Sequence, residues 1–244
     1  RFGKSHFGAL FGVARALSSP GRRVRHGAAT EDQVSAIVDE PMEKILSRLP
    51  LELQPERKGR TWTFRNPRWG DPRAKSTFSI HPVEFMKGDR LRGMGATDWF
   101  LDEVRDISQL EYLVRHVLGW QFVDALKEGF DPLLVMLSTP PETPAHPFSH
   151  VFIPEAEKSG TYFCVPASEN KDWSDEDASY VAELCGGRDT IAWYREAECK
   201  LIGDESKLVV PEFEPNSDRI IAPWPRPTHF FSYIAADSGW SDHT

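Results

Sequence analysis

The sequence predicts an α+β protein, one irregular globular domain that mixes amphipathic helices with short antiparallel strands. Apolar residues recur at three- and four-residue intervals in several segments, which is typical of helices packed on a core. Other short segments alternate polar and apolar side chains, as half-buried strands do. Nineteen prolines and eight tryptophans among 244 residues favour irregular, extended connections between these elements.

Two helices are predicted in the first fifty residues. The first covers residues 5–18, where apolar side chains share one face, and a flexible basic linker follows it. The second begins at Thr30, which can form a capping box with Gln33. Pro41 should kink or split this helix, and Pro50 closes it.

The middle of the chain predicts strands and then a long helix. Residues 61–64 and 76–80 alternate polar and apolar side chains, and the segment between them is rich in turn residues. Residues 97–118 carry a broad apolar stripe at helical spacing, with Thr97 and Asp98 as caps. Gly119 ends this predicted helix.

The remainder of the chain predicts further strands and one more helix. That helix begins at Ser174, which forms a second capping signature with Asp177, and it stops at two glycines. A turn at Gly160 makes a hairpin plausible for two of the strand candidates. The strand candidates are residues 132–137, 148–153, 161–165, 189–195 and 207–210.

These elements predict three parts. Residues 1–29 form a basic, amphipathic N-terminal arm, and residues 30–210 form the α+β core. Residues 211–244 form a C-terminal arm rich in proline and aromatic residues, which needs a receiving surface to offset its ordering entropy.

Charge is distributed unevenly along the chain, which has a net charge of −8. The first thirty residues carry six basic side chains and no acidic one, the composition of an organelle transit segment. Residues 93–244 carry eleven basic and twenty-seven acidic side chains, a net −16. This asymmetry predicts a mitochondrial protein, on the matrix side or associated with the inner membrane; a plastid address is the alternative.

No known catalytic motif is found, and GxSxG, HExxH and GxxxxGK[ST] are all absent, so we expect no catalytic residues, no cofactor and no metal. Gly93 and Gly95 supply too few glycines for a dinucleotide fingerprint. His146 and His150 stand four residues apart, but Pro147 removes the helical geometry that one metal ion would need.

Two other groups of residues are candidates for chemistry. His81 has a carboxylate close by in sequence and could act as a general base, yet a strand-end histidine is more often structural. The three cysteines, Cys164, Cys185 and Cys199, lack metal-type spacing and favour free thiols in a reducing compartment.

A basic stretch interleaved with tryptophan and phenylalanine is the strongest binding candidate. Arginine and lysine pair with phosphates, and aromatic rings can stack on bases. The acidic balance of the rest of the chain favours acidic protein faces or lipid head groups over nucleic acid. The candidate anion- or partner-binding residues are Arg57, Lys58, Arg60, Arg65, Arg68, Arg73 and Lys75.

These observations predict a non-catalytic accessory subunit of a large mitochondrial membrane-associated complex, such as a respiratory-chain complex or the ATP synthase. Its partners would be other protein subunits, and residues 5–18 could contact anionic lipid. No stretch is long and apolar enough for a transmembrane helix. The alternatives are an organellar ribosome component that binds RNA through residues 57–75, and an enzyme of unrecognised family with His81 or His146 in a cleft.

Overall fold

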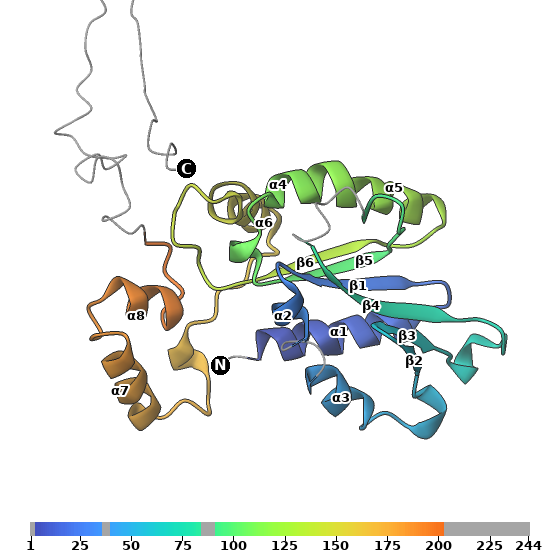
Figure 1. Ribbon diagram of the computed structural model, residues 1–244, viewed down its shortest axis with the longest axis horizontal. Coiled ribbons are helices and arrows are strands. Elements are labelled where there is room, and N and C mark those ends of the chain that lie inside the picture. The colour runs from blue at the N-terminus through green and yellow to red at the C-terminus, as the bar shows by residue number, and fades with distance from the viewer. Residues whose placement is uncertain (1–2, 36–39, 84–90, 203–244) are drawn as a thin grey trace, which may run out of the picture. The chain divides into compact units, whose positions relative to one another are not determined.

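The computed structural model describes residues 3–35, 40–83 and 91–202, and its centre is a six-stranded sheet with helices on both faces (Figure 1). These residues belong to a compact unit, Arg1–Asp204. A second unit, Glu205–Thr244, lies outside the described residues, as do the predicted strand 207–210 and the C-terminal arm.

The sheet has the strand order β2-β3-β4-β1-β5-β6. Strand β1 is parallel to β4 and β5, and β5 is parallel to β6, whereas β2, β3 and β4 pair antiparallel. The combination of helices and a sheet is confirmed, but the antiparallel expectation fails for three of these five pairings. The strands are β1 (Arg23–Ala28), β2 (Glu56–Lys58), β3 (Thr61–Phe64), β4 (Ser76–Pro82), β5 (Asp98–Asp102) and β6 (Leu133–Leu137).

The N-terminal residues are part of the core. Helix α1 (Lys4–Ser18) confirms the helix that was predicted over residues 5–18. It lies close against the sheet because small residues line its inner face: a Cβ at Gly12 would stand 2.4 Å from the Phe78 ring. The segment expected as a flexible linker contains β1, which lies between β4 and β5. Residues 4–28 therefore pack as a helix and an inner strand.

The second predicted helix is present as two short helices, α2 (Glu31–Val34) and α3 (Glu40–Leu46). Thr30 and Gln33 form the predicted capping box. Pro41 lies in the first turn of α3, where its missing N–H breaks no helical hydrogen bond. Together with α1, these helices cover one face of the sheet (Figure 1).

The helix predicted over residues 97–118 is wrong in its first half, because β5 begins at Asp98. This strand is buried on both faces, so its three central residues, Trp99, Phe100 and Leu101, are all apolar and lack the alternation of a half-buried strand. Helical structure starts only at α4 (Leu110–Tyr112). It continues through a π-helical segment, Leu113–Leu118, into α5 (Gly119–Lys127), on the face opposite α1 (Figure 1).

The C-terminal part of the described chain is helical. Its helices are α6 (Ile153–Ser159), α7 (Asp175–Leu184) and α8 (Ile191–Glu196). The Ser174–Asp177 capping box is confirmed, whereas the strands predicted at 148–153 and 189–195 are wrong. Residues 161–165 have no regular structure. Short aromatic-rich runs suit a strand or a buried helical turn equally well, so periodicity alone could not separate them.

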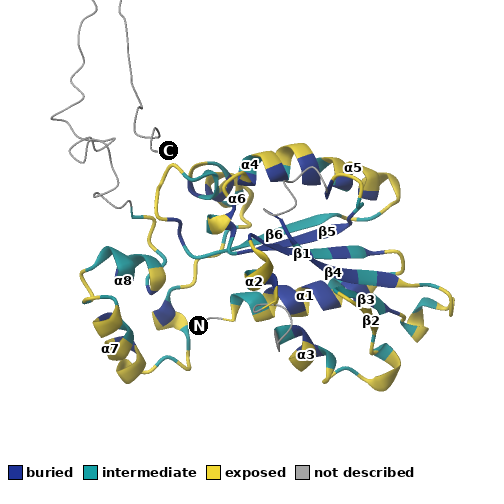
Figure 2. Cartoon of the chain, viewed as in Figure 1, coloured by how far each residue is buried: buried dark blue, intermediate teal, exposed yellow. Residues whose placement is uncertain are grey.

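Burial follows the layers, with buried residues on the sheet and on the inner faces of its helices (Figure 2). Among the described residues, no helix combines the length and the apolar character that a membrane crossing requires.

Candidate active site

The parallel strands β1, β5 and β6 end at one edge of the sheet, and the N-terminus of α1 reaches the same edge. Lys4, at the start of α1, has its Nζ 3.4 Å from Oε1 of Glu103, which directly follows β5. Ligands of open α/β sheets bind outside the carboxyl ends of the strands, so this edge is the first place to look for a site.

Gly3, Lys4 and Ser5 form the entrance to α1. Gly3 has φ of +67°, a left-handed conformation that suits glycine, and its carbonyl accepts the Phe7 N–H at 2.7 Å. No acidic residue lies in the first turn of α1. Free N–H groups and the positive end of a fifteen-residue helix therefore stand beside a lysine and a hydroxyl, an arrangement that attracts phosphate.

Asp102 closes β5 and is fully buried. Its Oδ1 accepts the backbone N–H of Glu103 at 3.0 Å. Burial works to raise the pKa of Asp102, but the His26 ring and the Ser5 hydroxyl outweigh burial and hold this pKa below its usual value. Its Oδ2 is buried without a hydrogen-bond partner among the described residues. Asp102 is thus an ionised carboxylate with one oxygen left for a ligand.

Glu103 has the left-handed φ of +45°, unusual for a residue other than glycine. Residues held in such conformations cluster at functional sites. Its carboxylate lies between two cations: Oε1 faces Lys4, and Oε2 is 3.7 Å from Nε of Arg105. The backbone turn therefore directs Glu103 across the edge of the sheet toward the start of α1.

Strand β6 adds hydroxyl groups at the same edge. Its last residue, Leu137, pairs in register with Asp102, so Ser138 and Thr139 follow immediately beyond the carboxylate. The Ser138 hydroxyl accepts the backbone N–H of Arg105 at 3.1 Å, which ties the two strand ends together. The Thr139 hydroxyl is buried and has no hydrogen-bond partner among the described residues.

The donor set fits Mg²⁺ only together with a phosphate ligand. No group of three or more histidine, cysteine, aspartate or glutamate side chains gathers around a metal-sized space in the described part of the chain. Mg²⁺ commonly takes one or two protein oxygens and completes its shell with water and substrate phosphates. The Ser5 hydroxyl and the free Asp102 oxygen supply such a pair.

The predicted basic patch lies elsewhere, on β2, β3 and the connection to β4, at the opposite end of the strand order from β6. Arg60 pairs with Glu31 at 2.5 Å, and Arg65 pairs with Glu56 at 2.6 Å. The structure does not bring the patch to the edge described above, and anion binding by it stays a prediction. Its members are Arg57, Lys58, Arg60, Arg65, Arg68, Arg73 and Lys75.

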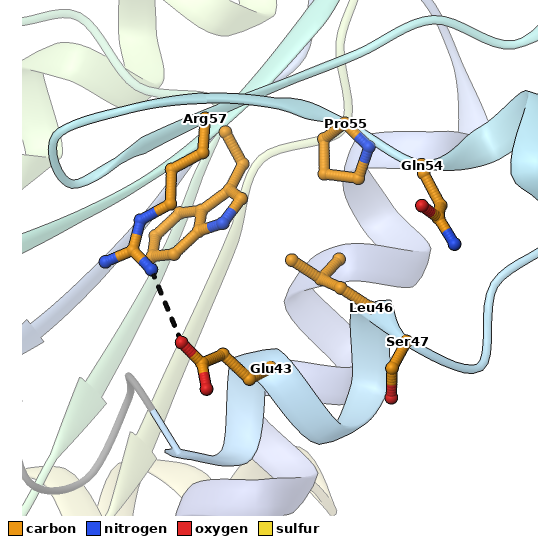
Figure 3. A pocket seen from close by; sticks show the side chains of 7 residues that line it. Glu43, Leu46, Ser47, Gln54, Pro55 and Arg57 are labelled. Carbon is orange, nitrogen blue, oxygen red and sulfur yellow. Dashed lines mark ion pairs between the residues drawn. The ribbon is translucent and has the colours of Figure 1, made fainter.

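Arg57 lines a hollow of about 260 Å³ between α3 and β2 (Figure 3). Its guanidinium lies 4.8 Å from the centre of the Trp62 ring, and Nη1 lies 3.8 Å from a Glu43 oxygen. The remaining lining includes Leu46 and Pro55. The hollow contains no group placed for acid–base or nucleophilic chemistry, so it is a packing feature beside the patch.

The candidate histidines are held in local hydrogen-bond networks. His81 Nε2 lies 2.9 Å from the Ser79 hydroxyl and 3.2 Å from Arg25. Burial and the nearby Arg25 and Arg60 lower the pKa of His81 to about 4. His146 accepts the Phe148 N–H at 3.2 Å. His81 stands at the register level of Leu101, directly before Asp102, but beside Trp99 on the opposite face of the sheet.

No protein-family model and no curated protein matches the sequence significantly. Solved structures of phage large terminases do match the fold. The ATPase domain of the Thermus phage P74-26 large terminase has a TM-score of 0.54 and 18% identity, over 83% of this chain and 85% of that domain.

Two longer large terminases match over part of their length. That of bacteriophage HK97 has a TM-score of 0.57 and 18% identity, over 81% of this chain and 44% of that one. That of a thermophilic bacteriophage has a TM-score of 0.57 and 15% identity, over 80% of this chain. The chain spans 45% of this thermophilic phage protein, and at these identities the likeness establishes the fold.

This fold overturns the predicted function. The solved structures that share this fold are phage large terminases and a terminase ATPase domain, so the comparisons contradict both the predicted accessory subunit of a respiratory-chain complex or the ATP synthase and the expectation of no enzyme. The prediction rested on the acid-free first thirty residues, but their arginines meet distant acids in the folded chain: Arg15 and Arg22 both pair with Asp98. The mitochondrial address and lipid contact by residues 5–18 remain untested predictions.

Sequence reasoning missed the residues at this edge. Gly3-Lys4-Ser5 matches the last three positions of GxxxxGK[ST], whose first glycine would precede Arg1, so a search for the whole signature finds nothing. The signals that could have found the site were this tripeptide at the start of an amphipathic helix and the acidic pair Asp102-Glu103 after a buried apolar run.

Proposed function

We propose that this chain binds the magnesium salt of a nucleoside triphosphate at the carboxyl edge of its sheet and hydrolyses the terminal phosphate, as an ATPase of the large-terminase type. The observation that carries the proposal is the meeting of Lys4 and Ser5 with Glu103 and Asp102 at one edge. The terminase ATPase fold supports it independently.

Each residue has a role that its chemistry allows. The Lys4 ammonium and the N–H groups at the start of α1 bind the phosphate oxygens. Ser5 and Asp102 would hold Mg²⁺, which neutralises charge that develops on the phosphates. Glu103 is the carboxylate that orients and activates the attacking water.

The ion pair between Lys4 and Glu103 also suggests how the site is kept inactive without nucleotide. Lys4 Nζ lies 3.4 Å from Glu103 Oε1. The ammonium therefore takes the carboxylate oxygen that would otherwise accept a hydrogen bond from the attacking water. A phosphate competes with Glu103 for Lys4. Binding of the nucleotide therefore releases the carboxylate at the moment when it is needed.

The test is to measure nucleotide binding and ATP hydrolysis in the natural full-length protein, including any residues before Arg1 or after Thr244. Lys4→Ala should lose both binding and hydrolysis. Glu103→Gln should keep binding and lose about 10²–10³-fold in kcat, because it keeps the shape but not the base.

The matched control is Lys127→Ala, which removes an exposed lysine whose Nζ lies 3.7 Å from Asp124. It should leave both measurements unchanged. Wild-type protein without nucleotide binding, or Glu103→Gln with the wild-type rate, would contradict the proposal.

A further inference from the structure

His26 is a buried polar side chain to which the roles above assign nothing. It lies on β1, next to β5, and has no exposed surface. Neither ring nitrogen has a hydrogen-bond partner among the described residues. Asp102 Oδ2 lies 3.7 Å from Nε2, and that oxygen also lacks a hydrogen-bond partner among the described residues.

Packing fixes the plane of this ring. It stacks on Phe100 with an interplanar angle of 11° and a centroid distance of 6.5 Å, and Phe78 lies 6.3 Å away. Helix α1 leaves room for the ring through Gly8, where a Cβ would stand only 3.2 Å from His26 Cε1. The side chain is thus held by apolar neighbours with Nε2 near the carboxylate.

An unsatisfied imidazole at this position is unfavourable for folding alone. Leaving a buried donor or acceptor without a partner destabilises the folded chain, and an apolar side chain would avoid that cost. Most buried polar groups in proteins are hydrogen-bonded, so an orphaned pair calls for a specific explanation. The explanation lies in what Asp102 must do when a ligand is present.

We propose that His26 is a positioning residue for Asp102, which donates its Nε2–H to Oδ2 and so aims the carboxylate at the magnesium nucleotide. The proposal rests on the proposed function. Closing the 3.7 Å separation by about 0.8 Å would give an ordinary hydrogen bond. The backbone N–H of Glu103 already holds Oδ1, so each carboxylate oxygen would then have one fixed donor.

With one donor fixed on each carboxylate oxygen, the remaining lone pairs of Asp102 are available to a metal ion held between Asp102 and Ser5. Carboxylates that hold metals are commonly oriented by such outer hydrogen bonds, and losing one reduces metal affinity or activity about 10–100-fold. His26 touches neither phosphate nor metal in this arrangement, and it acts only through Asp102.

The test measures Mn²⁺ affinity by electron paramagnetic resonance in the full-length protein with ADP, together with the melting temperature without metal. His26→Phe should weaken Mn²⁺ binding about 10–100-fold. Its melting temperature should stay the same or rise, because a buried unsatisfied group is removed. His26→Gln, which retains an N–H donor near the position of Nε2, should recover most of the affinity.

Phe78→Leu is the control, since it loosens the packing around the same ring without touching a polar group. It should lower the melting temperature and leave Mn²⁺ affinity nearly unchanged. If His26→Phe does not fold, His26→Leu serves the same comparison.

Mn²⁺ affinity unchanged in His26→Phe would overturn the positioning role while leaving the proposed function intact. A loss of Mn²⁺ affinity in His26→Phe that comes with a lower melting temperature would also overturn it, because general loosening of the fold would then explain the weaker binding. Wild-type protein that binds neither ADP nor Mn²⁺ with ADP would overturn the proposed function and this inference at once.

Discussion

Strand β5 carries a fully buried aspartate at each end, and the two are held in opposite ways. Asp98 begins the strand and Asp102 ends it. Because side chains alternate along a strand, residues 98 and 102 point to the same face, the one that α1 covers. Helix α1 therefore contacts both ends of β5, through Arg15 at Asp98 and through Ser5 at Asp102.

Asp98 is enclosed by donors. Arg15 donates from Nε to Oδ1 at 2.7 Å, Arg22 Nη1 lies 3.1 Å from Oδ2, and the Thr97 hydroxyl donates to Oδ2 at 2.6 Å. Both arginines also pair with Asp131, which follows α5. Two cations and a hydroxyl leave no capacity for a ligand at this end.

Among the described residues, Asp102 has no arginine or lysine partner. Its neighbours are one backbone N–H, the Ser5 hydroxyl and an imidazole that stands slightly too far away for a hydrogen bond. The comparison teaches that burial alone does not mark a functional carboxylate. The informative property is whether its neighbours saturate it.

The largest expected effect is a loss of folding stability, at the end of β5 where Asp98 is enclosed by donors. Asp98→Asn should reduce the free energy of unfolding by about 3–5 kcal/mol, because it leaves the buried Arg22 and the largely buried Arg15 without their shared counter-charge. Urea unfolding would measure this loss. Hydrolysis should change little at temperatures where the variant is folded; a selective loss of hydrolysis would break the comparison.

At the other end of β5, where Asp102 lies, the expected effect is on the rate of hydrolysis. Asp102→Asn should lower kcat by about 100-fold or more, equivalent to about 2.7 kcal/mol in the barrier. Its stability without nucleotide should fall much less than that of Asp98→Asn, since no buried arginine is left without its counter-charge. Steady-state kinetics and urea unfolding on one preparation would show this split. Destabilisation as large as that of Asp98→Asn would contradict it.

A smaller effect should follow from lifting α1 away from the sheet between the two ends. Gly12→Ala places a Cβ 2.4 Å from the Phe78 ring, and such overpacking costs about 1–3 kcal/mol. Because α1 carries Ser5 at one end and Arg15 at the other, stability and hydrolysis should fall together. Leu10→Ala, at a half-exposed position on the same helix, is the control. A loss of stability without a loss of hydrolysis, or the reverse, would show that the two ends of α1 respond independently.

The smallest effect concerns His81, a half-buried polar group that has hydrogen-bond partners, as Asp98 has, but lies on the other face of the sheet. The pKa of folded His81 is about 4, below the ordinary value of about 6.5. Between these values the unfolded chain binds the extra proton, so stability should fall as pH drops, by at most about 1.4 kcal/mol per pH unit.

His81→Gln should flatten this part of the pH dependence and leave hydrolysis at pH 8 unchanged. Urea unfolding at several values between pH 4 and pH 7 provides the measurement. An unchanged slope in the variant would mean that His81 does not carry the dependence.

The sequence alone determined the features that depend on neighbouring residues. The capping boxes at Thr30 and Ser174 are formed as predicted, because a cap requires only side chains and backbone groups three residues apart. Strands β3 and β4 follow their alternation, and β6 follows its apolar run, since composition and period suffice there.

Tertiary structure decided the rest. Strand β5 resembled a helix because both of its faces are buried, and only its neighbours β1 and β6 make it a strand. The basic N-terminal residues resembled a leader because the acids that neutralise Arg15 and Arg22 lie far along the chain. The candidate site was hidden for the same reason: Lys4 and Glu103 become a pair only when α1 packs across the parallel strands, a contact that no local pattern encodes.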